Sequence, residues 1–375
     1  MKRRAGVFFA SLGFASLLTA GEPLVSVGPG DGIPVFLTAA TTVRYDDNVL
    51  LQSSGKSSDT VFVLMPGFDL HTTGGVSQAG LSFSEQFIRY SSHSTLNSEL
   101  ASLAGNFAYT GAASSLSATS SYQQMDQSSL SLRSVDQTVR RDLTDASVNG
   151  SLGLTAKTSL GTGASFDRTR YPKVGYQDSD DWSFPVDVYY AVTPKVDLSL
   201  GYRYRRTTLS NSDYNSKDHF LNLGTRGSFT PKLSGQIRVG VTQRRDNAGN
   251  STNQLGLGTT INYLISPKTS LDLTASNDFS HSAFGTSQKT LSVGSNVQFG
   301  FTPRWGATTG VSFESTSYLS VQARKDKFWV GNVGLNYTLT ANSAIQVAYL
   351  FRKNSSNQGV NFNNNVLSLS ASIRF

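Results

Sequence analysis

Apolar and polar residues alternate along most of the chain, in segments of about ten residues that are separated by turns. The segment that begins at Val196 shows this most clearly, because its two faces differ in character. The apolar face carries Val196, Leu198, Leu200, Tyr202 and Tyr204, and the polar face carries Asp197, Ser199, Gly201, Arg203 and Arg205. Successive side chains of a strand point to opposite faces, so each segment predicts a β-strand with one apolar face.

The turns between these segments also repeat. Thr193-Pro194-Lys195 recurs as Thr230-Pro231-Lys232, Ser266-Pro267-Lys268 and Thr302-Pro303-Arg304. The four prolines are 37, 36 and 36 residues apart. Such a period marks a repeated supersecondary unit, here a β-hairpin, because proline sets the turn and cannot continue a strand ladder.

Short turns alternate with longer, more polar connections along the chain. This asymmetry is typical of outer-membrane barrels, which have short periplasmic turns and long external loops. The predicted fold is all-β: a transmembrane antiparallel up-and-down β-barrel over residues 35–375, with 18 strands, or 16 if one hairpin is miscounted. A soluble β-propeller has a similar period, but a single apolar stripe on each strand favours the barrel. Pro66 and Pro185 fall inside predicted strands, where we expect bulges or late strand starts.

The first 34 residues differ from the rest. Lys2, Arg3 and Arg4 precede a short apolar run that ends near Ala20, so residues 1–20 predict a signal peptide. Residues 21–34, rich in Gly and Pro, predict an extended periplasmic lead-in. The formal net charge of +7 would fall to 7 − 3 = +4 in the mature chain, which does not indicate a nucleic-acid partner.

The inner faces of the predicted strands are rich in small polar residues, as a water-filled lumen requires. The charged residues that we expect to face this lumen are Asp197, Arg203, Arg205, Arg238, Asp272, Asp278 and Arg374. The longest connection, 126–142, is hypothesised to fold inward and narrow the channel. Its charged residues are Arg133, Asp136, Arg140, Arg141 and Asp142, and a solvated surface loop is the equal alternative.

Catalytic and metal chemistry finds little support in the sequence. The chain has no Cys and four His, none of them beside a recognisable nucleophile motif. Asp218 and His219 are neighbours along a strand, so their side chains point to opposite faces. Acidic pairs such as Asp46-Asp47 are better explained as turn formers than as Ca²⁺ ligands. We therefore expect no enzymatic activity, no metal and no cofactor.

Two segments resemble known outer-membrane proteins. Tyr45-Asp46-Asp47-Asn48, followed by a loop and by Met65-Pro66-Gly67-Phe68, is similar to the opening of the family known as "putative β-barrel porin". The terminal Phe375 resembles the general signal that the barrel assembly machinery reads. The resemblance implies a location in the outer membrane of a Gram-negative cell, and some relatives are associated with exopolysaccharide or capsule export.

The function that fits these patterns best is a porin-like channel for passive passage of small hydrophilic solutes. The alternatives are a barrel component of exopolysaccharide export and a structural or adhesive barrel without transport. A carbohydrate path would favour inward aromatic residues, and Tyr189 and Phe220 are the best candidates. The expected partners are outer-membrane lipid, the assembly machinery, small solutes or polysaccharide, and further copies of the chain in a homo-oligomer.

Overall fold

The structure is a computed structural model that describes residues 25–27, 33–72, 75–127, 139–320, 323–358 and 361–375. The described residues form 19 strands and two short 3₁₀ helices. The strands are β1 (Val25–Val27), β2 (Ile33–Asp46), β3 (Asp59–His71), β4 (Ser77–Tyr90), β5 (Ser98–Thr110), β6 (Ser114–Gln127), β7 (Val139–Gly153), β8 (Thr158–Arg170), β9 (Ser179–Thr193), β10 (Val196–Leu209), β11 (Ser216–Thr230), β12 (Leu233–Asp246), β13 (Ser251–Ser266), β14 (Thr269–His281), β15 (Ser287–Gly300), β16 (Trp305–Tyr318), β17 (Lys325–Thr340), β18 (Ser343–Ser356) and β19 (Phe362–Arg374). The 3₁₀ helices are η1 (Ser94–Leu96) and η3 (Ser212–Tyr214). No helix in these ranges is long and apolar enough to span a bilayer.

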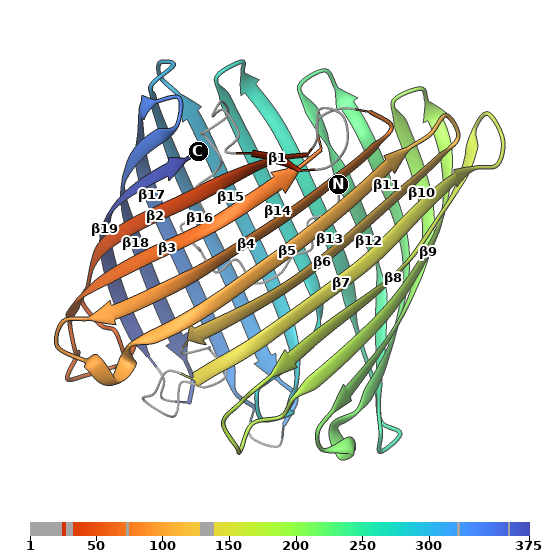
Figure 1. The fold of residues 1–375 in the computed structure, drawn as a ribbon. Coiled ribbons are helices and arrows are strands. Elements are labelled where there is room, and N and C mark those ends of the chain that lie inside the picture. The colour runs from red at the N-terminus through yellow and green to blue at the C-terminus, as the bar shows by residue number, and fades with distance from the viewer. Residues whose placement is uncertain (1–24, 28–32, 73–74, 128–138, 321–322, 359–360) are drawn as a thin grey trace.

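Strands β2 to β19 form one closed barrel (Figure 1). Each strand pairs antiparallel with the next along the chain, and β19 pairs with β2 from Val366↔Asp46 to Arg374↔Thr38. Closure leaves the sheet without a free edge, which a transmembrane sheet requires because lipid cannot satisfy backbone groups. The prediction of 18 barrel strands is confirmed.

The additional strand, β1, lies in the predicted lead-in. It pairs with the first residues of β2, from Val25↔Val35 to Val27↔Ile33. On this side β19 pairs with β2 only from Thr38 onward, and the backbone of Phe375 then bonds Leu37 in both directions at 2.8 Å. β1 thus pairs with the backbone of the first residues of β2, which extend beyond the reach of β19.

The short turns and the C-terminal end of the chain lie at the same end of the barrel (Figure 1). In the turns with the repeated Pro, the preceding hydroxyl group organises the backbone. Thr230 Oγ1 accepts hydrogen bonds from the N–H groups of Lys232 (3.3 Å) and Leu233 (3.0 Å), and Thr302 Oγ1 does the same for Arg304 and Trp305. The repeated Thr/Ser-Pro-Lys/Arg sequence is therefore a local turn motif that ends one strand and starts the next.

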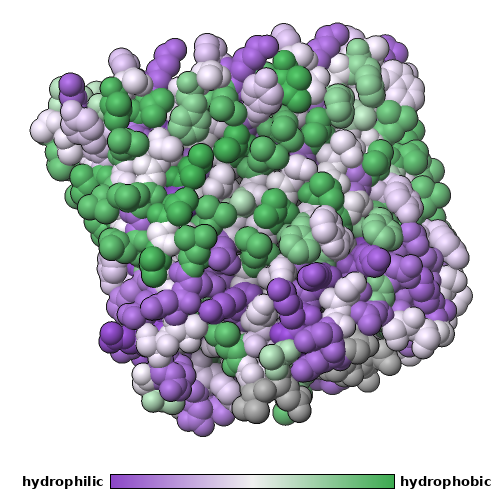
Figure 2. Space-filling view, turned by 180° about the vertical axis from the view of Figure 1, so that it is seen from behind, coloured by the Kyte–Doolittle hydropathy of each residue, from purple (hydrophilic) through white to green (hydrophobic). Residues whose placement is uncertain are grey.

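The apolar faces of the strands point outward. Leu200 and Leu223 are 55% and 68% exposed, whereas the polar residues Asp218 and Asn364 are almost completely buried inside. Figure 2 shows the outward apolar residues as a band, with hydrophilic residues below it toward the longer loops. A lipid-facing apolar band around a polar interior is the arrangement of a membrane barrel, the inverse of a soluble protein.

The expectation of bulges or late starts at the strand prolines was wrong. The β3–β4 ladder pairs Leu64 with Phe87, skips the residues around Pro66, and resumes at Gly67↔Ser84 in the same register. The β8–β9 ladder skips Pro185 in the same way, between Thr162↔Val186 and Ser165↔Ser183. Each proline therefore interrupts the pairing of one ladder over a few residues. The pairs on either side of the interruption keep the same register.

The Asp46-Asp47-Asn48 segment joins the first and last barrel strands at their loop ends. Asn364 Nδ2 of β19 donates to Asp46 Oδ1 at 2.6 Å. Asp47 accepts from the backbone and side-chain N–H groups of Asn365 at 2.7 and 2.6 Å. Partial burial alone would raise the pKa of Asp47, but these hydrogen bonds outweigh it and lower the pKa below its usual value. We call this cluster the seam clasp.

Asn48 is the buried centre of the seam clasp, with no exposed surface. Its Nδ2 donates to the carbonyl oxygens of Gln52 at 2.8 Å and of Asn363 at 3.1 Å. Its Oδ1 accepts from the N–H of Gln52 at 2.9 Å. The asparagine thus fixes the start of the external loop against β19.

Candidate channel constriction

All seven lumen-facing candidates lie on the polar face of their strands, opposite the exposed apolar residues. Four of them form ion pairs or hydrogen bonds with residues one to three strands away on the wall. Arg226 Nε lies 2.9 Å from Asp197, Arg238 lies 2.6 Å from Asp187, Arg374 lies 2.7 Å from Asp69, and Asn262 donates to Asp272 at 2.7 Å. The other three, Arg203, Arg205 and Asp278, meet although β10 and β14 are four strands apart.

Strand β14 leaves the barrel wall near its loop end. Its ladder with β13 stops at Leu257↔Asn277, so Ser251–Gly256 of β13 pair only with β12. Its ladder with β15 continues to His281↔Ser287. The segment 278–287, which we call the inward hairpin, therefore has no ladder with β13 and can lean away from that strand.

The inward hairpin reaches β10. Arg203 lies 2.7 Å from Asp278, and Arg205 donates to Asp278 at 3.2 Å and to the carbonyl oxygen of Phe279 at 2.8 Å. β10 and β14 are four strand steps apart, roughly 19 Å along a regular wall. An arginine and an aspartate cannot span that distance together, so the contact requires the inward position of β14.

Two further residues complete this cluster. Asp218 of β11 binds Arg205 and also accepts from Arg244 of β12 at 2.7 and 2.8 Å. Arg244 then donates to the carbonyl oxygen of Ser280 at 2.9 Å. We call Arg203, Arg205, Asp218, Arg244 and Asp278 the mouth bridge. Hydrogen bonds between arginine and carboxylate groups are stronger than neutral ones, although Arg203 Nε is buried here without a hydrogen-bond partner.

The tip of the inward hairpin contacts the opposite rim. The carbonyl oxygen of Ala283 accepts from the N–H of Gln177 at 2.7 Å, and Ala283 packs on Val139 of β7. The rings of Phe284 and Tyr176 lie 5.5 Å apart. The hairpin thus crosses the loop end of the lumen from β14 to the connection between β8 and β9.

The loop predicted to narrow the channel is shorter than expected. Arg140, Arg141 and Asp142 belong to β7, and Asp126 belongs to β6. Arg140 and Asp142 pair with each other at 3.3 Å on the outer face. Arg133 and Asp136 lie outside the described residues. Among the described residues, the segment that makes contacts across the loop end is the inward hairpin, which the sequence pattern predicted to be an ordinary connection.

Asp218, Arg244, Asp187 and Arg226 were missed as lumen residues. The alternation signal could have found them, because each occupies an inner-face position of a predicted strand. The local pattern does not give the partner of each charge. Asp218 and Arg226 pair with residues of adjacent strands, whereas Asp187 pairs with Arg238 three strands away.

Arginine side chains stack on the rings of the two inward aromatic residues, Tyr189 and Phe220. Tyr189 lies under Arg226, with the guanidinium carbon 3.3 Å from the ring centre, and Phe220 lies under Arg203 at 5.1 Å. Both rings are buried. The two residues expected to serve a carbohydrate path therefore do not offer ring faces to the lumen.

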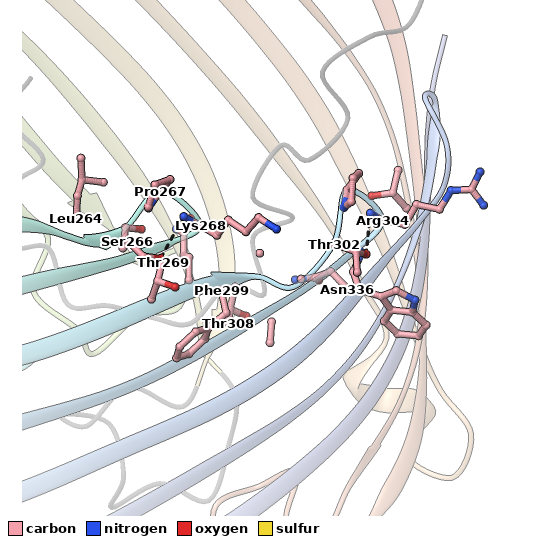
Figure 3. A pocket seen from close by; sticks show the side chains of 18 residues that line it. Leu264, Ser266, Pro267, Lys268, Thr269, Phe299, Thr302, Arg304, Thr308 and Asn336 are labelled. Atoms are coloured by element: carbon pink, nitrogen blue, oxygen red, sulfur yellow. Dashed lines mark hydrogen bonds between the residues drawn. The ribbon is translucent and has the colours of Figure 1, made fainter.

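Two hollows lie away from the mouth bridge. One, of about 670 Å³, is lined by inner-face polar residues of β3 to β7, including Asp69, Asn106 and Asp145. The other, of about 340 Å³, lies at the turn end of the barrel between the turns at Pro267 and Pro303. Figure 3 shows Lys268 and Arg304 there, each with its backbone bonded to the hydroxyl group two residues earlier.

A closed antiparallel barrel with an apolar outer band and a charged inner face defines an outer-membrane channel protein. The family model described as "Putative beta-barrel porin 2" matches residues 35–375, and the chain belongs to this family. It is a porin-like channel of the outer membrane for small solutes.

Solved structures with a similar fold are distant in sequence. The outer membrane protein OpdK from Pseudomonas aeruginosa is 12% identical, with a TM-score of 0.48 over 91% of this chain and 99% of that one. OccAB4 from Acinetobacter baumannii is 13% identical, with a TM-score of 0.46 over 93% and 100%. OccK2 from P. aeruginosa, solved with glucuronate, is 13% identical, with a TM-score of 0.48 over 91% and 98%. No curated protein matches the chain significantly.

Proposed function

We propose that small hydrophilic solutes cross this barrel passively and that the mouth bridge is the narrowest part of their path. The observation that carries the proposal is the contact of Arg205 with Asp278 and the carbonyl oxygen of Phe279, which holds the inward hairpin across the loop end. An 18-stranded barrel is otherwise wide enough for an aqueous channel.

The chemistry of the mouth bridge supports polar solutes of either charge. It combines three guanidinium groups with two carboxylates, and Asp181 adds a third carboxylate that accepts from Thr207. A solute that passes the mouth bridge can therefore hydrogen-bond to both donors and acceptors. The electrostatic potential there is neither strongly positive nor strongly negative.

The proposal is a transport role without catalysis. Asp218 faces the lumen in the mouth bridge, while His219 faces outward and bonds the hydroxyl group of Tyr202 at 2.7 Å. His93 does pair with a carboxylate, Asp59 at 2.8 Å. That carboxylate also accepts from the backbone N–H groups of Ser92 and His93, which supports a role in anchoring the loop.

The purified mature chain, refolded into a planar lipid bilayer, is expected to give discrete and stable conductance steps. In a salt gradient the reversal potential should be close to zero, because the two carboxylates of the mouth bridge and Asp181 together oppose its three guanidinium groups. A correctly folded barrel that passes no current would contradict the proposal. A strongly shifted reversal potential would contradict the balanced constriction while leaving the channel itself in place.

We also propose that the assembly machinery reads Phe375, whose ring is half exposed at the C-terminal end of the barrel wall. Phe375→Ala is expected to reduce strongly the amount of barrel in the outer membrane, while refolding in vitro stays normal. Phe301→Ala, at another exposed aromatic residue beside a short turn, is the matched control. Equal outer-membrane levels of the two variants would count against this role.

A further inference from the structure

Three cationic side chains stand in one row on the outer surface of neighbouring strands β10, β11 and β12, which lie side by side (Figure 1). Arg206 of β10 is directly opposite Lys217 of β11, and Lys217 is directly opposite Arg245 of β12. All three side chains are exposed. We call them the cation row.

The row points to lipid rather than to the lumen. Outer and inner residues alternate on each strand, and the inner neighbours Arg205, Asp218 and Arg244 belong to the mouth bridge. The cations share their face with exposed apolar residues farther along the same strands. The row formed by Tyr202, Leu221 and Val241 is in register with them, and so is the row formed by Leu200, Leu223 and Val239.

The height of the row matches the headgroup level of a membrane. Each cation lies four residues from the apolar row of Tyr202, Leu221 and Val241, toward the loop end. Four residues span roughly 13 Å of strand, or about 10 Å along the membrane normal for a strand tilted by about 40°. The intervening row is Tyr204, His219 and Gln243, whose polar groups suit the interface.

Nothing in the described chain neutralises the row. None of its three residues forms an ion pair there, and like charges directly opposite each other destabilise a sheet. The nearby carboxylates are engaged elsewhere: Asp180 holds Arg168 at 2.9 Å, and Asp246 accepts from Asn250 at 2.7 Å. Asp213 of η3 forms no ion pair with the row among the described residues. An external anion would remove this repulsion.

We propose that the cation row binds the phosphate groups of a phosphorylated glycolipid in the outer leaflet. Three cations spaced by about 4.8 Å can share the oxygens of one phosphate or bridge two. The aliphatic and aromatic rows below them would contact the acyl chains of the same lipid. The site lies outside the channel, so it is independent of the transport role.

The test measures glycolipid bound to the purified barrel in a neutral detergent by native mass spectrometry. The triple variant Arg206→Gln, Lys217→Gln, Arg245→Gln is expected to bind roughly 100-fold more weakly, because each cation near an anionic membrane surface contributes about fivefold. The control removes the same charge from the same outer end at Arg89, Arg140 and Arg168, each of which has a carboxylate partner. This control variant should bind within a few-fold of the wild type.

A second measurement needs no variant. Wild-type barrel is offered the phosphorylated glycolipid and its dephosphorylated form, and only the phosphorylated form should stay bound. Equal binding of the two forms, or unchanged binding by the triple variant, would overturn the proposal. Displacement of the glycolipid by inorganic phosphate at equal concentration would overturn the choice of a lipid and identify free phosphate as the ligand.

Discussion

Replacing Arg205 with Ala is expected to raise the single-channel conductance roughly twofold or more, because an 18-stranded barrel without an obstruction holds an aqueous channel. Arg205 joins Asp218 to Asp278 and to the backbone of Phe279. Without it, the inward hairpin loses its central tie to β10 and can return toward β13. The measurement is single-channel current in a planar bilayer at fixed salt.

The neighbouring residue supplies the control. Arg206 has the same side chain one position farther along β10 but faces outward, so Arg206→Gln should leave the conductance unchanged. Since the chain has no Cys, Arg205→Cys and Asp278→Cys can also be combined and joined by a short bifunctional thiol reagent. The cross-linked barrel should conduct less than the same barrel before cross-linking. A folded Arg205→Ala barrel with wild-type conductance would refute the constriction.

Replacing Asn48 with Ala is expected to destabilise the barrel by about 2–4 kcal/mol, because the change leaves buried backbone groups without partners. The side chain of Asn48 bonds Gln52 twice and Asn363 once, with no access to solvent. Its loss should loosen the seam between β2 and β19 first. Unfolding by urea in detergent, followed by gel mobility and by circular dichroism, measures the effect.

The matched control is Asn253→Ala, at an exposed asparagine on the outer face of β13. It should shift the unfolding midpoint little. If the Asn48 and Asn253 variants unfold at the same urea concentration, the seam clasp does not stabilise closure. The Tyr45-Asp46-Asp47-Asn48 resemblance would then need a different explanation.

Local signals in the sequence accounted for most of the fold. Alternation with a period of two shows which residues face outward, as at Leu198 and Leu200, because it follows from strand geometry alone. The Thr/Ser-Pro-Lys/Arg turns that mark strand ends are also local signals. Their hydrogen bonds join residues only two or three positions apart in the sequence. Strand number, chain direction and the polar lumen follow from these two local patterns.

The candidate site depended on contacts that no local pattern encodes. Asp278 has an ordinary inner-face position in the sequence, and only the early end of the β13–β14 ladder brings it to Arg203 and Arg205. The cation row depends in the same way on the register of three strands. Pairing across a sheet couples residues far apart in the chain, and a one-residue shift would exchange inner and outer faces.

The sequence by itself therefore determined that this chain is an 18-stranded outer-membrane barrel, because alternation and turn chemistry act over a few residues. The tertiary structure decided where the barrel narrows, what Asp46, Asp47 and Asn48 hold together, and which cations stand in one row. The physical reason is that these three features arise from side chains on strands that meet only after the barrel closes.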